Sequence, residues 1–248
     1  MLFSLHAALF APLIVVVAYI VLAIGGFGSA LIAIPLLALL IPVKVVIPAL
    51  LLVDILATTL TGLRFRKDVD LAEMKPLIAP TLVGLIAGVT LLVKLPSHWV
   101  LSALGVFILG YGVYSLIGKP RRHPHSKWWA VPAGVSGGVC GGLFGMGGPV
   151  YVVYLAGRLR EAARLRATLS AVFTINTAAR LLMLLASGLL LQKEVWIAAA
   201  YLLPFMPLGL LIGHRLHVKL SAQQIVWFLS VLLILTGASV LWKALAAA

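Results

Sequence analysis

The sequence predicts an all-α membrane protein made of two inverted-topology repeats, each a glycine-broken helical hairpin followed by three transmembrane helices. Three observations predict this fold class. The chain is 63% apolar with a mean hydropathy of +1.17, glycine clusters interrupt two corresponding apolar segments, and the basic residues gather on one face of the resulting layout. Soluble domains are only about 45–50% apolar, so a water-soluble fold of 248 residues could not bury this composition.

The apolar residues lie in stretches of membrane-spanning length. Stretches without any Lys, Arg, Asp or Glu are 1–43, 76–93, 95–118, 128–157, 195–214 and 220–242. A helix of about 20 apolar residues crosses the hydrocarbon core of a bilayer. Short loops account for most of the rest, so we expect one membrane domain with no soluble domain of useful size.

The two halves of the chain carry the same elements in the same order, which indicates a duplication. The offset between matching residues drifts slowly, as differences in loop length require. We therefore expect a first repeat at 1–118, a basic cytoplasmic linker at 119–127 and a second repeat at 128–248. The matches are 26–29 with 145–148 at an offset of 119, Asp54 with Asn176 at 122, Gly84 and Gly88 with Gly209 and Gly213 at 125, and Lys94 with Lys219.

Each half opens with an apolar segment that is too long for one crossing. Residues 8–41 as a continuous helix would reach about 50 Å, against a hydrocarbon core of about 30 Å. Glycines destabilise helix near 25–28 and again between 137 and 148. Each opening segment is therefore predicted to be two helices that enter and leave on the same side. The full layout is hairpins at 8–41 and 129–157 and spans at 45–63, 76–93, 98–117, 167–190, 195–213 and 221–243.

The distribution of basic residues tests this layout independently. Eight simple spans would divide them almost evenly, 10 to 8, whereas the two hairpins divide them 14 to 4. The positive-inside rule expects such an excess on the cytoplasmic face. The layout with two hairpins inverts the second repeat relative to the first and places both termini on the outer face. The inner set is Arg64, Arg66, Lys67, Lys75, Lys119, Arg121, Arg122, Lys127, Arg158, Arg160, Arg164, Arg166, Arg215 and Lys219; the outer set is Lys44, Lys94, Lys193 and Lys243.

Two charged residues, Asp54 and Arg180, lie inside predicted spans. Charges at that depth are costly and usually face a cavity or pair with each other. In one interpretation they form an ion pair that fixes helix packing. In the other, Arg180 binds an anion through its planar donor fork while Asp54 holds it or exchanges a proton. Asn176 lies one helical turn before Arg180, and Thr58 is the counterpart of Arg180 in the first repeat.

The two glycine breaks offer a second kind of anion ligand. A half-helix that starts inside the membrane presents unpaired N–H groups and the positive end of its dipole. The candidate positions are Gly28 and Ser29 in the first repeat and Gly147 and Gly148 in the second. Close helix packing by small residues is the alternative explanation of these glycines.

Other functional classes lack support in the sequence. The net charge of +13 comes from clusters at span ends without interleaved aromatic residues, so we expect no nucleic-acid partner. One cysteine, Cys140, excludes an internal disulfide framework and a Cys-based zinc site. We expect no cofactor, no metal and no catalytic residue, because no nucleophile, base and orienting group occur together. The N-terminus lacks the charged region of a signal peptide.

The chain resembles the TauE/SafE family of sulfite and organosulfur-anion exporters. The resemblance covers nearly the whole chain and rests on the paired openings AlaIleGlyGlyPheGlySerAlaLeuIleAlaIlePro at 23–35 and GlyLeuPheGlyMetGlyGlyProValTyrVal at 142–152. These differ from the usual glycine runs of the family at Ser29, Ala30 and Pro149. The resemblance implies a bacterial inner-membrane transporter that exports sulfite or a related small sulfur-containing anion.

Two other functions fit the same elements less well. A passive anion channel could be built on the same repeats, and saturable, uphill flux would distinguish a transporter from it. A membrane-embedded enzyme would require a convergent set of histidines or carboxylates, which the sequence does not show. A homo-oligomer is compatible with this sequence.

Overall fold

The structure is a computed structural model that describes residues 5–25, 28–62, 68–117, 126–215 and 222–246. Within these ranges the chain is helical and contains no strand, as predicted. Its helices are α1 (Leu5–Gly25), α2 (Ser29–Ala38), α3 (Val43–Gly62), α4 (Leu71–Lys94), α5 (Ser97–Ile117), α6 (Ala130–Phe144), α7 (Gly148–Arg158), α8 (Ala162–Ala186), α9 (Lys193–Leu202), α10 (Phe205–Arg215) and α11 (Ala222–Ala246), with 3-10 turns at Lys127–Trp129 and Leu189–Leu191.

Helices of membrane-crossing length and composition are present, which confirms the all-α membrane class. Six helical stretches among the described residues are long and apolar enough to cross a bilayer. Their exposed side chains are largely aliphatic and aromatic, as lipid-facing surfaces require. The stretches are His6–Ile24, Leu71–Lys94, Ser97–Ile117, Ala163–Ala186, Lys193–Arg215 and Trp227–Ala246.

The chain forms two compact units, and each unit takes helices from both predicted repeats. Unit 1 comprises Met1–Val46, Leu95–Arg121 and Ala200–Ala248, and unit 2 comprises Ile47–Lys94 and Arg122–Ala199. The compact units therefore cross the predicted repeat boundaries. The reason is that helices from opposite halves of the sequence pack closely together within each unit.

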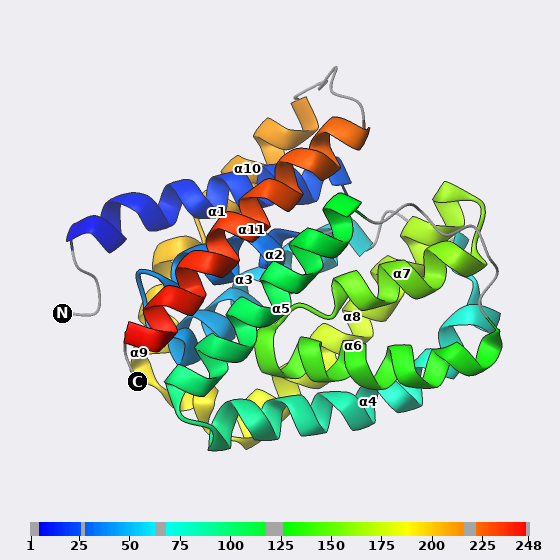
Figure 1. Ribbon diagram of the computed structural model, residues 1–248, viewed down its shortest axis with the longest axis horizontal. Coiled ribbons are helices and arrows are strands. Elements are labelled where there is room, and N and C mark those ends of the chain that lie inside the picture. The colour runs from blue at the N-terminus through cyan, green and yellow to red at the C-terminus, as the bar shows by residue number, and fades with distance from the viewer. Residues whose placement is uncertain (1–4, 26–27, 63–67, 118–125, 216–221, 247–248) are drawn as a thin grey trace. The chain divides into compact units, whose positions relative to one another are not determined.

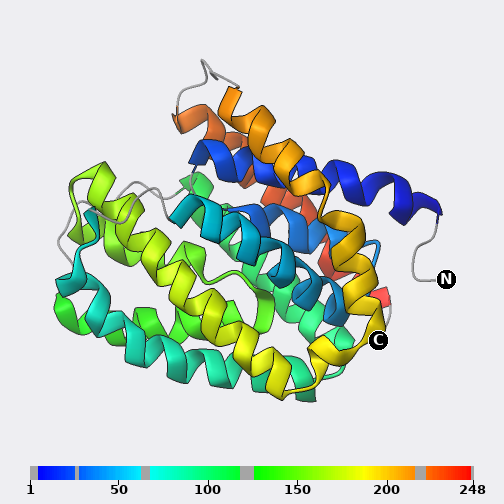
Figure 2. The same cartoon turned by 180° about the vertical axis from the view of Figure 1, so that it is seen from behind.

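In unit 2, α4 packs along α6 through small residues (Figure 1). A Cβ atom added at Gly84 would collide with the carbonyl oxygen of Val135, and one added at Gly88 would collide with that of Val139. On the facing helix, a Cβ at Gly142 would lie 2.6 Å from the oxygen of Leu85. Two membrane helices approach this closely only where their contact residues are small. The same unit places α8 beside α4 (Figure 2).

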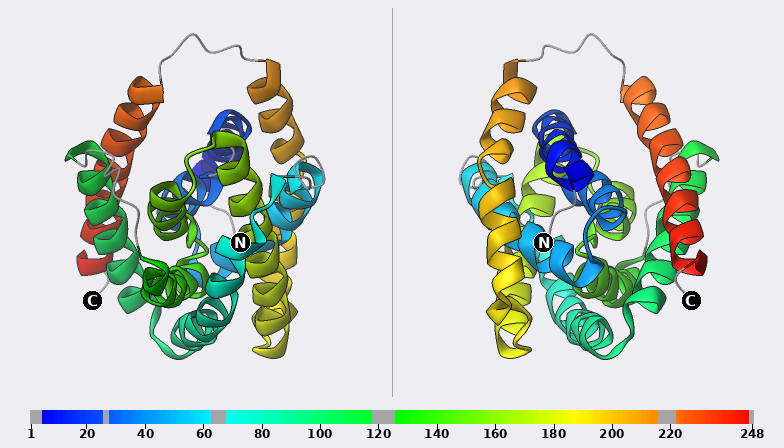
Figure 3. Two further views of the ribbon diagram at one scale, coloured as in Figure 1. Left: turned by 90° about the vertical axis from the view of Figure 1, so that its right-hand side faces the viewer. Right: turned by 90° about the vertical axis from the view of Figure 1, so that its left-hand side faces the viewer.

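In unit 1, α1 packs on α10 through a similar pair of glycines (Figure 2). A Cβ atom at Gly209 would lie 2.6 Å from the oxygen of Val16, and one at Gly213 would lie 2.8 Å from the oxygen of Ile20. Helices α5 and α11 run side by side in the same unit (Figure 3).

These two helix contacts repeat the sequence offsets of the predicted duplication. Gly84 and Gly209 differ by 125 positions, and the residues they touch, Val135 and Val16, differ by 119. Both numbers are the offsets found for the matching sequence segments. An α4–α6 contact and an α10–α1 contact of the same design support a duplicated origin, and the inverted arrangement stays a prediction.

The helix breaks fall at the predicted glycines. Gly28 has φ +107° immediately before α2, and Gly145 has φ +75° at the end of α6, where its N–H group donates to the oxygen of Gly141 at 2.9 Å. Glycine reaches such backbone angles without the steric penalty of a Cβ atom. One helix is longer than the prediction of two short helices in each opening segment. Helix α1 has 21 residues and is long enough to cross a membrane by itself.

One span was predicted without a break that the structure contains. The segment at 195–213 is divided into α9 and α10, with a turn at Leu203 and Pro204. Proline has no N–H donor and its ring clashes with the preceding turn of a helix, so a continuous helix is interrupted there. Pro204 was visible in the sequence and is the physical reason for the difference.

Five tryptophans lie exposed near helix ends. Trp99 and Trp196 lie in the first turns of α5 and α9, Trp128 and Trp129 precede α6, and Trp242 is close to the end of α11. All five are more than half exposed. Amphipathic rings at such positions suit the interface between hydrocarbon and water.

Candidate functional site

The buried polar residues of the candidate site lie on α8 in unit 2. Asn176 and Arg180 are 7% and 5% exposed, although they belong to an apolar helix. They are four residues apart and therefore share one helix face, as predicted. A buried guanidinium requires partners because its charge has been removed from water and from lipid headgroups.

Arg180 has two neighbours on α3. Its Nη2 donates to the carbonyl oxygen of Ile47 at 3.3 Å, and the Asp54 carboxylate acts on it electrostatically. The two predicted charged residues therefore lie within one unit and interact. Arg180 Nε is fully buried and makes no hydrogen bond within the part of the chain that the structure describes. An arginine with an unused donor in its planar fork retains the capacity to bind a small oxyanion.

Asn176 is fixed by a residue that the sequence interpretation missed. Its Nδ2 donates to the hydroxyl of Tyr151 on α7 at 3.1 Å. A Cβ atom at Gly141 on α6 would lie 3.0 Å from the same nitrogen. The amide is therefore held between α6 and α7. A tyrosine inside an apolar run carries no local signal of such a bond. A comparison of the two repeats could have marked it, because the residue that matches Tyr151 at an offset of 119 is the apolar Ile32.

The two glycines at the start of α7 differ in how closely they are packed. A Cβ atom at Gly147 would lie 2.5 Å from the oxygen of Gly137 and 2.8 Å from Cε2 of Tyr151, so a side chain cannot fit there. At Gly148 the nearest atom, Cζ of Phe173, would lie 3.4 Å away, which is ordinary contact. This geometry favours the packing explanation of Gly147, and solute binding by the backbone N–H groups at the start of α7 stays a prediction.

The first glycine break belongs to unit 1. Gly28 precedes α2, and among the described residues no atom lies within 4 Å of an added Cβ there. Ser29 is 7% exposed at the first position of α2. Convergence of the two breaks on one cavity involves both units and stays a prediction.

The threonines near the polar residues give little information on solute contact. Thr174 donates to the oxygen of Ser170 at 2.9 Å within its own helix. Thr58 lies in α3, but its side chain is outside the described residues, as is that of Thr59. The prediction that Thr58 faces the solute is therefore untested.

Comparison with known proteins decides the family. The family model described as "Sulfite exporter TauE/SafE" matches residues 11–240. The chain belongs to this family. A relative from Comamonas testosteroni, named "Probable inner membrane transporter protein TsaS", is 30% identical over 202 residues, which cover 78% of this chain and 82% of the relative. No solved structure matches the chain. This TauE/SafE protein is thus a membrane transporter, in agreement with the resemblance in its sequence.

The TauE/SafE chain also contains a partly buried ion pair that the sequence did not predict. Arg158 at the end of α7 donates from Nε to Oε2 of Glu73 on α4 at 2.9 Å and from Nη2 to Oε1. The two side chains are 18% and 11% exposed. Hydrogen bonding to Glu73 raises the pKa of Arg158 above its ordinary value. The partners are 85 residues apart, and no local pattern marks them as a pair.

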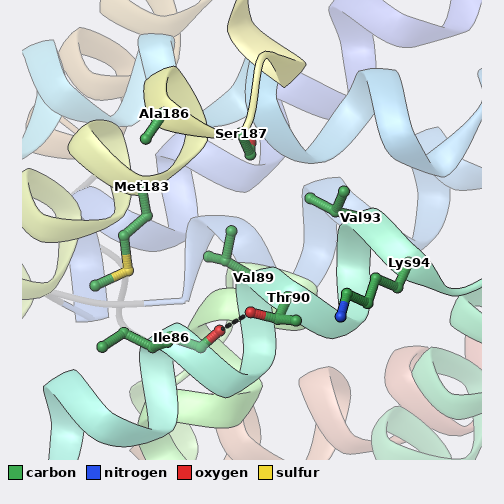
Figure 4. A pocket seen from close by; sticks show the side chains of 8 residues that line it. All are labelled: Ile86, Val89, Thr90, Val93, Lys94, Met183, Ala186 and Ser187. Atoms are coloured by element: carbon green, nitrogen blue, oxygen red, sulfur yellow. Dashed lines mark hydrogen bonds between the residues drawn. The ribbon is translucent and has the colours of Figure 1, made fainter.

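A separate cavity of about 320 Å³ lies between the ends of α4 and α8 (Figure 4). Its lining is aliphatic apart from Thr90, Ser187 and Lys94, and the Thr90 hydroxyl is already used by the oxygen of Ile86 at 2.7 Å. None of the predicted solute-binding residues whose side chains are described lines it. Its remaining lining residues are Ile86, Val89, Val93, Met183 and Ala186.

Proposed function

We propose that this TauE/SafE transporter exports a small oxyanion, sulfite or a related sulfur-containing anion of the sulfonate type, across the bacterial inner membrane by alternating access. The observation that carries the proposal is the buried Arg180, whose Nε makes no hydrogen bond to any described residue. Arginine pairs with planar or tetrahedral oxyanions through two parallel donors. The family description, which names a sulfite exporter, supports this class of solute.

Three polar residues of unit 2, Arg180, Asn176 and Asp54, each have a role in this proposal. Arg180 and Asn176 supply donors to the anion from one face of α8. Asp54 on α3 acts on the arginine and keeps it from holding the anion too tightly, because its negative charge competes for the same cation. A proton taken up by Asp54 would relieve that competition and make anion binding depend on pH.

The helix breaks at Gly28 and Gly145 support the proposal. Discontinuous helices at the repeat interface commonly form the solute sites of secondary transporters. In unit 2 the break at Gly145 separates α6 from α7, and Gly147 at its end packs against Gly137. We propose that backbone groups at each break bind the anion, those of Gly28 and Ser29 in unit 1 and those of Gly147 and Gly148 in unit 2.

Transport in proteoliposomes tests the proposal. Purified protein is reconstituted and the flux of sulfite, sulfate, a small sulfonate and chloride is measured with and without an imposed proton gradient. Saturable sulfite or sulfonate flux that the gradient drives uphill supports the proposal. Non-saturating flux that only follows the concentration gradient indicates a passive channel, and no flux of any sulfur-containing anion contradicts the proposed solute class.

A further inference from the structure

Tyr151 is buried across the glycine break of unit 2. Its side chain has no exposed surface. A Cβ atom at Gly137 on α6 would lie 2.5 Å from Cε1 of its ring, and one at Gly147 would lie 2.8 Å from Cε2. Both glycines therefore provide the space that the ring occupies. The α6–α7 hairpin is folded around this tyrosine.

The far side of the same residue contacts α8. Its ring centroid lies 6.2 Å from that of Phe173, and its hydroxyl accepts from Nδ2 of Asn176 at 3.1 Å. Thr81 of α4 is buried beside this hydroxyl. Tyr151 thus connects the hairpin to the helix that carries Arg180, one turn beyond Asn176.

The first repeat shows that the hydroxyl is not a general requirement of such a hairpin. At the offset of 119, the position of Tyr151 is occupied by Ile32, which is 2% exposed in α2. An aliphatic side chain is sufficient for packing there. The residue that matches Asn176 in the first repeat is Asp54. Its side chain has no amide to orient, so no hydroxyl is needed at the position of Ile32.

We propose that Tyr151 is a positioning residue that orients the Asn176 amide toward the transported anion, an inference that rests on the proposed function of Asn176. A side-chain amide has two N–H donors at one end and a carbonyl oxygen at the other. The bond to Tyr151 uses one N–H group and fixes the direction of the second. Without the hydroxyl the amide can turn by a half rotation and present its oxygen to the anion, which repels it.

Two measurements on Tyr151→Phe test this role, because the variant keeps the ring and removes only the hydroxyl. The first is the KM for sulfite or sulfonate transport, which we expect to rise about tenfold, since one oriented hydrogen bond is lost, with a smaller change in maximal rate. The second is the alkylation rate of Cys140, the single cysteine, which lies on α6 next to Gly141. We expect faster alkylation because the hairpin is less firmly attached to α8.

Tyr154→Phe is the matched control, because Tyr154 is a buried tyrosine three residues later on the same helix that faces Glu73 instead of Asn176. It should leave the KM and the Cys140 alkylation rate unchanged. In an Asn176→Ala background, Tyr151→Phe should add no further rise in KM, because there is no amide left to orient. An additive rise would overturn the positioning role.

The two measurements separate this inference from the proposed function. If the unmodified protein transports no sulfur-containing anion, the proposed function fails. The alkylation rate of Cys140 still reports whether Tyr151 attaches the α6–α7 hairpin to α8. If transport is present and Tyr151→Phe changes neither the KM nor the alkylation rate, the positioning role is wrong and the proposed function stands. A loss of folded protein alone, with the KM unchanged in the folded fraction, also overturns it.

Discussion

Gly209 of α10 lies directly against Val16 of α1, so that an added Cβ atom would come within 2.6 Å of the Val16 oxygen. Gly209→Ala should therefore force the helices apart and lower the free energy of unfolding by about 1–3 kcal/mol. Gly84→Ala, at the matching position against Val135, should cost a similar amount. Thermal unfolding of the purified variants measures both effects.

Gly110→Ala on α5 is the control for these substitutions. No atom lies within 4 Å of an added Cβ at Gly110, and alanine is the better helix former by about 1 kcal/mol. The midpoint of unfolding should stay the same or rise. Equal destabilisation at Gly110 and Gly209 would contradict the close-packing explanation.

The sequence allowed prediction of the features that depend on local chemistry. Breaks at glycines are predictable because a positive φ, as at Gly28 and Gly145, is costly for every other residue. The shared face of Asn176 and Arg180 follows from helical periodicity. The Tyr151–Asn176 bond and the Arg158–Glu73 pair could not be predicted, because each depends on how separate helices pack, and a single sequence does not contain that information.

Removing the charge of Glu73 should destabilise unit 2. In Glu73→Gln the Arg158 guanidinium stays largely buried and loses its anionic partner, so the free energy of unfolding should fall by about 1–3 kcal/mol. The raised pKa of Arg158 means that its charge favours the folded state at every pH below the ordinary arginine value. The loss should therefore be the same at neutral and mildly alkaline pH in unfolding measurements.

Glu161→Gln provides the comparison for an exposed pair. Glu161 bonds to Arg164 at 3.1 Å, and the two side chains are 64% and 57% exposed. Exposed pairs contribute little to stability, so the unfolding midpoint should barely move. If Glu161→Gln lowers the free energy of unfolding as much as Glu73→Gln does, burial is not the reason that the Glu73–Arg158 pair stabilises the protein.

Arg180→Lys should impair transport more than folding. Lysine keeps the positive charge but loses the two-pronged donor geometry, so sulfite flux should fall by about tenfold or more while the yield of folded protein stays near normal. Asp54→Asn should change the dependence of flux on the proton gradient. Arg164→Lys, at an exposed arginine of the same helix, is the control, and normal flux in Arg180→Lys would remove the bidentate-ligand hypothesis.

The two helix breaks should respond differently to alanine. Gly28→Ala meets no steric obstacle but places a Cβ atom on a residue with φ +107°, which costs about 1–2 kcal/mol. Gly148→Ala has a nearest contact of 3.4 Å and an ordinary backbone, so it should be almost neutral. Unfolding midpoints compare the two, and equal effects would show that backbone conformation at Gly28 is unimportant.

The inverted arrangement can be tested by labelling single cysteines from outside intact cells, after replacing Cys140 with alanine. Residues 44 and 193 are predicted to react with a membrane-impermeant maleimide, and residues 67, 122 and 160 to react only after permeabilisation. The decisive pair is 122 and 160, which flank the α6–α7 hairpin. Helix α7 has 11 residues and is about 16 Å long, too short to cross a hydrocarbon core of about 30 Å. Both flanks should therefore be cytoplasmic, and a chain of simple spans requires them to label from opposite faces.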